Sequence, residues 1–208
     1  MTQTSALLQQ ELHLNGTTRP GGRTARTRTA VLAATLAELA EHGYAELTVE
    51  QIAQRSGVHK TTVYRRWGGV DGLLVDALGD ASADEWTAPD TGTLLGDLTA
   101  INAELLAGFT DPVAGAVPTA VISAAFQSDA ASEALRAFYL DRYQRCAVAV
   151  TRAIERGDVP AGTDGTEVVR ASVAPLFHRL FISREPVGDA DVTRAAAAAV
   201  AAAKTGVY

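Results

Sequence analysis

The sequence predicts an all-α fold, and three observations support this prediction. Apolar residues recur every three or four positions over most of the chain, which is the spacing of one helix face. Glycine and proline stand at the ends of these periodic segments, where helices usually end. No stretch alternates apolar and polar residues in the manner of a half-buried strand. We therefore expect a small N-terminal helical domain followed by a larger helical domain.

The first helix is expected to run from about Thr27 to His42, and Gly43 ends it. A second and a third, both short, follow in the next twenty or so residues. A fourth is expected to begin near Val70. The periodic segments farther along the chain predict helices over 94–108, 117–127, 132–156, 166–183 and 189–204.

The two short helices are joined by a tight turn. Thr48 can cap the first of them, and Gln51 completes a capping box three residues later. Gly57 suits the left-handed backbone that commonly ends a helix. In the second short helix, Val63 and Trp67 are expected to pack inward, which leaves polar side chains outside. A helix-turn-helix needs this division, because its second helix enters the DNA major groove.

The charge of the chain is distributed unevenly. The formal net charge is −6, yet residues 19–66 hold eight basic and four acidic side chains, a net of +4. Residues 67–208 hold ten basic and nineteen acidic side chains, a net of −9. A basic first part joined to an acidic remainder is typical of a DNA-binding module on a body that avoids DNA.

Residues 1–25 are polar and rich in Gly, Thr and Arg, so we expect a flexible arm. Two interpretations of this arm stay open. It is either a solvated tail without a role or a segment whose arginines contact phosphates or the minor groove. The arginines concerned are Arg19, Arg23, Arg26 and Arg28.

Four segments carry a resemblance to a known family: Glu41-His42-Gly43-Tyr44, residues 47–53, residues 56–67, and Asp71-Gly72-Leu73-Leu74. With this spacing the chain resembles the tetracycline-repressor (TetR) family of bacterial transcription regulators. In that family a Gly-aromatic corner closes the first helix, and a recognition helix ends in Tyr-x-x-aromatic. The resemblance implies an N-terminal three-helix helix-turn-helix DNA-binding domain, placed at 26–70. It also implies a larger helical ligand-binding and dimerisation domain, placed at 71–208.

The sequence departs from the family pattern at two places. The family often has Pro-Ser-Lys after the recognition helix, and that lysine contacts a phosphate. Here the residues are Gly68, Gly69 and Val70, so this contact is lost and the dipole of the next helix has to act with the arm. Position 59, usually a small polar cap, is His59, which can still accept a bond from a helix N-terminal amide.

Polar side chains on and around the recognition helix are expected to face double-stranded operator DNA, both by resemblance and by spacing. Thr61 and Thr62 can offer a methyl to thymine or a hydroxyl to a base edge. Thr48 and Arg66 are candidates for phosphate contacts. The full candidate set is Thr48, His59, Lys60, Thr61, Thr62, Tyr64, Arg65, Arg66, Arg26 and Arg28.

The resemblance further implies that a small-molecule effector binds the second domain and releases a repressor from a palindromic operator. An apolar or aromatic effector suits the composition of this domain. The alternative is that the same side chains form an ordinary core. The candidate ligand-binding residues are Trp86, Ile101, Leu105, Phe109, Val121, Ile122, Phe126, Phe138, Tyr139, Arg142, Tyr143, Phe177 and His178.

We also expect a homodimer through the last two helices, because dimeric helix-turn-helix proteins read two half-sites. The alternative is that the apolar faces of these helices pack within one chain. The residues of these faces are Val168, Val169, Val173, Leu176, Phe177, Leu180, Phe181, Val192, Ala195, Ala196, Ala199, Val200 and Ala203.

Other classes of protein find little support. The sequence contains no Gly-x-Ser-x-Gly, no phosphate-binding glycine loop and no clustered His or Cys, so we expect no enzyme, metal or cofactor. A single cysteine, Cys146, rules out an internal disulfide and fits a reducing cytoplasm. No apolar run approaches the ~20 residues of a membrane span, and residues 1–16 lack a secretory pattern. Two rival interpretations remain. The first is a DNA-binding or interaction protein that has no effector, and the second is an activator in place of a repressor.

Overall fold

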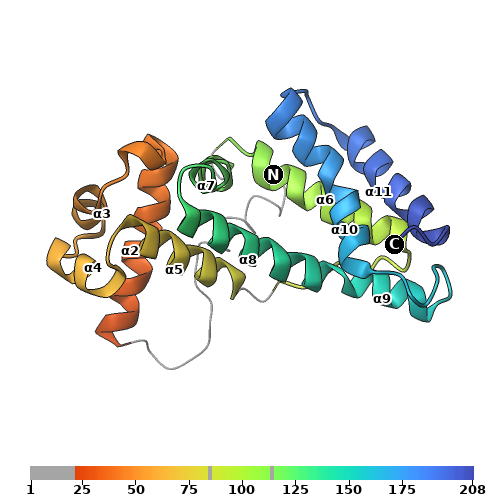
Figure 1. Ribbon diagram of the computed structural model, residues 1–208, viewed down its shortest axis with the longest axis horizontal. Helices are drawn as coiled ribbons and strands as arrows, with labels where there is room; N and C mark the ends of the chain where they lie inside the picture. Colours follow the sequence, from red (N-terminus) through yellow and green to blue (C-terminus); the bar gives the residue numbers. More distant parts are fainter. Residues whose placement is uncertain (1–21, 84–85, 113–114) are drawn as a thin grey trace. The chain divides into compact units, whose positions relative to one another are not determined.

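The structure is a computed structural model that describes residues 22–83, 86–112 and 115–208 (Figure 1). These residues form helices joined by turns and loops, as the sequence predicts. The chain forms two compact units. The first comprises the described residues up to 83 and those of 111–138, and the second comprises 86–110 and 139–208. Within the described ranges, no helix is long and apolar enough to cross a membrane.

The first unit is built around α2 (Arg23–His42). This helix contacts α3 (Val49–Ser56), α5 (Val70–Ser82) and α7 (Ala116–Ala125). Helix α4 (Lys60–Trp67) contacts both α3 and α5. Burial of one apolar face from each helix stabilises this arrangement. The fully buried side chains of this core include Val31, Leu39, Ile52, Val63 and Leu73.

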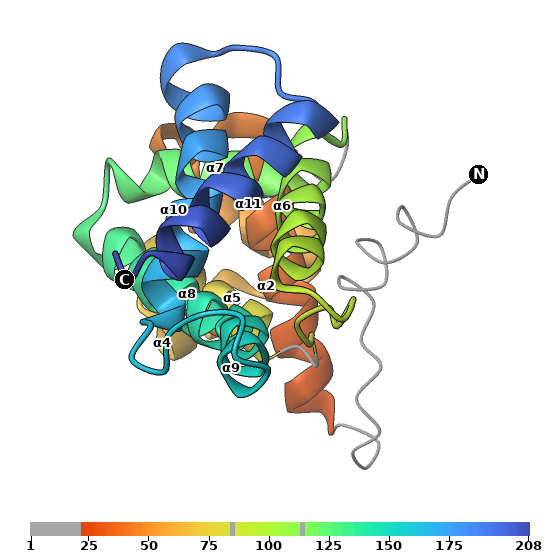
Figure 2. The same ribbon diagram turned by 90° about the vertical axis from the view of Figure 1, so that its right-hand side faces the viewer.

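The second unit contains α6 (Leu94–Thr110), α9 (Val148–Glu155), α10 (Gly165–Phe177) and α11 (Asp189–Lys204). Helices α6, α10 and α11 contact one another and lie side by side (Figure 2). Helix α8 (Asp129–Cys146) contributes its first turns to the first unit and its last turns to the second.

A buried hydrogen-bond cluster joins three helices of the second unit. Asn102 of α6 is fully buried, and its Nδ2 donates to the carbonyl oxygens of Ser172 on α10 (3.3 Å) and Val192 on α11 (3.2 Å). Ser172 Oγ donates in return to Asn102 Oδ1 (3.1 Å). Because a buried amide without partners is costly, these bonds favour one alignment of the three helices.

Most predicted helices are confirmed, and three differ from the prediction. Helix α2 begins at Arg23, so residues 23–25 are helical and do not belong to an arm. The helix expected over 132–156 is divided at Ala147, where the Val150 amide donates to the Ala147 carbonyl (3.0 Å) and tightens the turn. The helix expected over 166–183 ends in a π-helical turn, His178–Ser183, shortly after Pro175 removes a backbone donor.

Candidate nucleic-acid interface and ligand site

The turn between α3 and α4 has the geometry that the sequence predicts. Thr48 Oγ1 accepts from the Gln51 amide (3.3 Å), and the Gln51 side chain accepts from the Thr48 amide (2.8 Å), which confirms the capping box. Gly57 adopts φ 67° and ψ 17°, a left-handed conformation that glycine reaches without strain. Val58 then packs against the core of the unit.

The inner face of α4 is anchored by two side chains. Val63 is fully buried, as predicted, and Trp67 is half-buried against the same core. Trp67 Nε1 donates to Asp76 Oδ2 on α5 (2.7 Å). The recognition helix is therefore held by both apolar packing and a hydrogen bond to the next helix.

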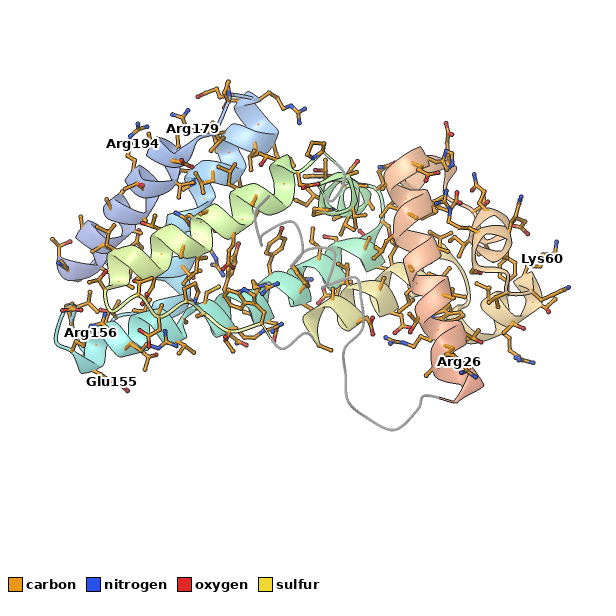
Figure 3. The ribbon with its side chains drawn as sticks, turned by 180° about the vertical axis from the view of Figure 1, so that it is seen from behind. Arg26, Lys60, Glu155, Arg156, Arg179 and Arg194 are labelled. Carbon is orange, nitrogen blue, oxygen red and sulfur yellow. The ribbon has the colours of Figure 1, made fainter. Side chains whose placement is uncertain are left out.

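The outer face of α4 is polar and open. Lys60, Thr61, Tyr64 and Arg65 are exposed, with Tyr64 47% exposed despite its aromatic ring, and Thr62 is half-buried. Figure 3 shows Lys60 projecting away from the helices. Its Nζ lies 3.7 Å from Glu50 Oε1 on α3, and both side chains are more than half exposed, so this ion pair is weak.

His59 caps the recognition helix. Its Nδ1 accepts a hydrogen bond from the Thr61 amide (3.4 Å) and lies 3.0 Å from Thr61 Oγ1. The prediction that histidine serves as a cap at this position is confirmed.

The arginines near the start of α2 have different environments. Arg26 is exposed at the N-terminal end of the helix (Figure 3). Arg28, by contrast, donates to Asp76 (2.7 Å) and to Asp80, so its charge is balanced inside the unit and a DNA contact would require breaking these bonds. The Arg28 guanidinium, and after it Trp67, holds the pKa of the Asp76 carboxyl below its usual value. Arg19 lies outside the described residues.

Arg66 is turned toward the protein as well as toward solvent. Its guanidinium stacks on the Trp67 ring, 4.8 Å from the centroid, and Nη1 donates to the Thr24 carbonyl (3.3 Å). A phosphate contact by Arg66 would therefore start from a side chain that is already oriented by α2.

Two polar clusters of the first unit were not found from the sequence. Tyr44 OH and Ser128 Oγ both donate to Asp71 Oδ1, at 2.7 and 2.8 Å. Arg55 on α3 binds Glu38 and Glu41 on α2. An open hollow of about 450 Å³ adjoins the second cluster, and the polar residues that line it do not suit an apolar effector. All these partners are distant in sequence, so no local pattern signals them.

Aromatic side chains of the second unit gather into a cluster, which we call the ring cluster: Tyr139, Phe177, Phe109 and Phe181. The Phe177 ring lies 5.7 Å from Tyr139 and 5.6 Å from Phe109, both edge to face. Tyr143 adjoins Tyr139 at 5.8 Å. Burial raises the pKa of the Tyr139 phenol.

Beside these rings, within the same unit, Arg142 lies over Trp86, with 4.5 Å from Cζ to the ring centroid. Trp86 Nε1 donates to Glu104 (2.9 Å). Arg142 is close enough to Tyr139 to act on its phenol electrostatically. The structure thus places Trp86, Arg142, Tyr139, Tyr143 and Phe177 in partly buried positions that combine aromatic surface with charge.

Several predicted ligand-binding residues do not share this environment. Phe126 is 86% exposed, because it follows the last turn of α7 and no side chain of the described residues covers it. Phe138 packs against the core of the first unit. His178 is exposed at the start of the π-helical turn, whereas Ile101 and Leu105 pack in the core of the second unit. The described ranges contain no group of three His, Cys, Asp or Glu side chains arranged to hold a metal ion.

The faces predicted to form a dimer are already used within one chain. Most of their side chains are buried by contacts of α10 with α11 and of both with α6, so these atoms are not available to a partner. For the buried residues of these faces, packing within the chain is the alternative that holds, and the homodimer itself stays a prediction. The buried residues are Val168, Val169, Val173, Leu176, Val192, Ala195, Ala196, Ala199 and Ala203.

Comparisons with known proteins agree with this anatomy. Residues 31–77 match the family described as bacterial regulatory proteins, tetR family. Residues 88–199 match the tetracyclin repressor-like C-terminal domain. The chain is 34% identical to the HTH-type transcriptional regulator AqdR of Rhodococcus erythropolis, over 71% of this chain and 70% of AqdR.

Two further proteins extend the comparison. The DNA-binding transcriptional repressor TetR of Mycobacteroides abscessus is 30% identical over 79% of this chain and 87% of its own length. The crystal structure of the TetR family regulator SCO0332 superposes with a TM-score of 0.66, at 32% identity, over 84% of this chain and 97% of that one. The chain is therefore a DNA-binding transcription regulator and belongs to the TetR family.

Proposed function

We propose that this regulator is a repressor that leaves a palindromic operator when a small molecule binds its second unit. The observation that carries the proposal is the open polar face of α4 on a helix whose other face is anchored by Val63 and Trp67. Such a helix can enter a major groove while its inner face keeps its contacts with the rest of the unit. The residues that we assign to the DNA are Thr48, His59, Lys60, Thr61, Thr62, Tyr64 and Arg65.

We assign the effector site to the ring cluster and to Arg142. An apolar or aromatic molecule suits edge-to-face rings beside a guanidinium. To act on DNA binding, the effector must bind two conformations with different affinity. Helix α8 supports such coupling, because it carries Tyr139 and Arg142, while Leu135 and Phe138 of its earlier turns pack in the core of the first unit.

The relative from Mycobacteroides abscessus is a transcriptional repressor. This supports repression, rather than activation, as the role of the present chain. An activator would use the same DNA-binding face. A protein without an effector would keep the same DNA affinity whatever small molecule is added. As a regulator of transcription, the protein would act in the cytoplasm.

A homodimer would place one recognition helix on each half-site of the operator. We assign its interface to the outer side of α10 and α11, since their inner side is used within the chain. On α11 this outer side exposes Thr193, Ala197 and Ala201, whose small side chains permit close helix approach.

The test is fluorescence anisotropy of the purified protein on DNA from upstream of its own gene and on a scrambled duplex, over a salt series. We expect tight binding to the upstream duplex only, with two chains per duplex and a steep fall with salt. A library of aromatic small molecules is then added to the complex, and a repressor should release DNA with some of them. Absence of binding at low salt would exclude the assigned interface.

A further inference from the structure

The hydrogen bonds at the start of α4 determine which nitrogen of His59 carries the proton. A backbone amide can only donate, so the bond from the Thr61 amide requires Nδ1 to be an acceptor. The neutral ring has one N–H, which must then be on Nε2. A proton on Nδ1 would instead point at the amides of the first helical turn, which the helix dipole disfavours.

The same constraint orients the Thr61 hydroxyl. Thr61 Oγ1 lies 3.0 Å from His59 Nδ1, and because Nδ1 carries no hydrogen, the hydroxyl must donate to it. The only hydrogen of the hydroxyl is thereby used. The oxygen of Thr61 presents only lone pairs to any other partner, although a free threonine hydroxyl can both donate and accept.

Both groups are on the surface that faces DNA in the proposed function. His59 and Thr61 are exposed, and His59 Nε2 has no hydrogen-bond partner among the described residues. A neighbouring exposed lysine, Lys60, points outward from the same turn (Figure 3). The first turn of a recognition helix is the part that reaches base edges in helix-turn-helix complexes.

We propose that His59 holds Thr61 Oγ1 as a fixed acceptor that reads the DNA sequence, and that His59 Nε2–H is itself a fixed donor to the DNA. In the major groove the base groups that donate are the amino groups of adenine and cytosine. Thr61 therefore selects adenine or cytosine on the contacted strand and rejects guanine and thymine. His59 Nε2–H donates to an acceptor oxygen or nitrogen, either on a base or on a phosphate. This inference rests on the proposed DNA-binding face.

The proton position is tested without DNA. Long-range proton–nitrogen NMR spectra of the full-length protein under mildly alkaline conditions report which ring nitrogen of His59 is protonated. We expect Nε2 to carry the proton in the wild type. In Thr61→Val, which keeps the amide but lacks the hydroxyl, the same tautomer should persist, because the amide bond alone requires it. A proton on Nδ1 in the wild-type protein would overturn the proposal.

The effect on specificity is tested by selecting duplexes from a random DNA pool with the wild type and with matched variants. Thr61→Val should lose a preference for adenine or cytosine at one half-site position by about 3- to 10-fold, which is the range of a single hydrogen bond. Thr61→Ser, which keeps the hydroxyl, should retain it. If Thr61→Val retained the wild-type preference at every position, the acceptor role would be wrong.

His59 is tested with His59→Ser, since the serine oxygen can cap the helix but no donor reaches the position of the distal ring N–H. We expect unchanged thermal unfolding and DNA binding weakened by about 3- to 10-fold. A loss at one base position assigns Nε2–H to a base edge, and an equal loss on all sequences assigns it to a phosphate. Unchanged affinity and selectivity would overturn the donor role. If the wild type selected no sequence, the DNA-binding face would fail, and the NMR result would still decide the tautomer.

Discussion

Lys60 and Tyr64 place their functional groups in solvent, so their removal should affect DNA binding and leave the fold intact. We expect Lys60→Ala to weaken binding and to reduce the salt dependence of log K by about 1, because one positive charge on the DNA-binding face is lost. Tyr64→Ala should also weaken binding. The free energy of unfolding should change by less than about 0.5 kcal/mol in both variants. Anisotropy over a salt series and urea unfolding provide the two measurements.

The control for this pair is Val63→Ala on the opposite side of the same helix. Val63 is fully buried, so its truncation should lower the free energy of unfolding by about 2 kcal/mol. If Lys60→Ala and Tyr64→Ala both bound upstream DNA like the wild type at physiological salt, the assignment of the outer face would be wrong.

Cys146 should be an unreactive thiol. It is 2% exposed, and burial raises its pKa from the ordinary value of 9 to about 11. We expect slow reaction with a thiol reagent in the native protein and fast reaction in urea. Fast modification of the native protein would contradict this.

Between about pH 9 and 11 the folded state holds the proton on Cys146 that the unfolded state has lost, so stability falls as pH rises. The stability advantage of wild type over Cys146→Ala should therefore narrow in that window.

Local interactions of single residues were predictable from the sequence, and distant ones were not. The caps formed by Thr48 and His59 involve partners two or three positions away, and the residue types reveal them. Arg28 looked like a DNA contact because its charge is visible in the sequence. Its partners, Asp76 and Asp80, are 48 and 52 positions away, so only the packing of α2 on α5 reveals that this charge is balanced.

At the scale of helices, Asp76 joins three elements of the first unit, because it accepts from Arg28 of α2 and Trp67 of α4. We expect Asp76→Asn to lower the free energy of unfolding by about 1–2 kcal/mol at neutral pH. The pKa of Asp76 is below its ordinary value of 3.8, so its contribution is present at neutral pH and is lost as pH falls below that value. Urea unfolding at several pH values measures this.

The matched control is Asp80→Asn, which removes a more exposed carboxylate from the same arginine. It should cost clearly less than Asp76→Asn, since Trp67 keeps its acceptor and exposed ion pairs contribute little. A loss from Asp76→Asn that persisted undiminished in acid would show that the ion pair is not its source.

In the second unit, Asn102 joins three helices by hydrogen bonds, as Asp76 does in the first unit. Replacing it by alanine removes three hydrogen bonds and leaves Ser172 Oγ without its acceptor in a buried environment. We expect Asn102→Ala to lower the free energy of unfolding by about 2–3 kcal/mol. Ser172→Ala, which removes only one of the three bonds, serves as the milder variant. Equal stability of Asn102→Ala and wild type would mean that helix packing alone aligns α6, α10 and α11.

The helices themselves were largely predictable, since their periodicity and caps are local properties. Helix α11 begins and ends where the sequence places it, at Asp189 and Lys204. The division at Ala147 was not predictable, because the apolar spacing continues through it and only the backbone hydrogen bonds change. The faces of α10 and α11 show what periodicity cannot predict. Apolar spacing predicts that a face is buried, but it does not tell whether the same chain or a partner covers that face.

For the whole molecule, the inner faces of α10 and α11 are buried within the chain, so we propose that two chains meet through the outer side of these helices, with α11 as the part to test. We expect Ala197→Arg, a large charged change at an exposed position, to prevent dimerisation while leaving the helical circular dichroism unchanged. Analytical ultracentrifugation should then show monomers. Affinity for a two-half-site duplex should fall by about 100-fold or more, because the two heads no longer bind as one unit. The control is Ala137→Arg, the same change at an exposed position of α8, which should stay dimeric. If Ala197→Arg remained a dimer with wild-type DNA affinity, another surface would have to join the two chains.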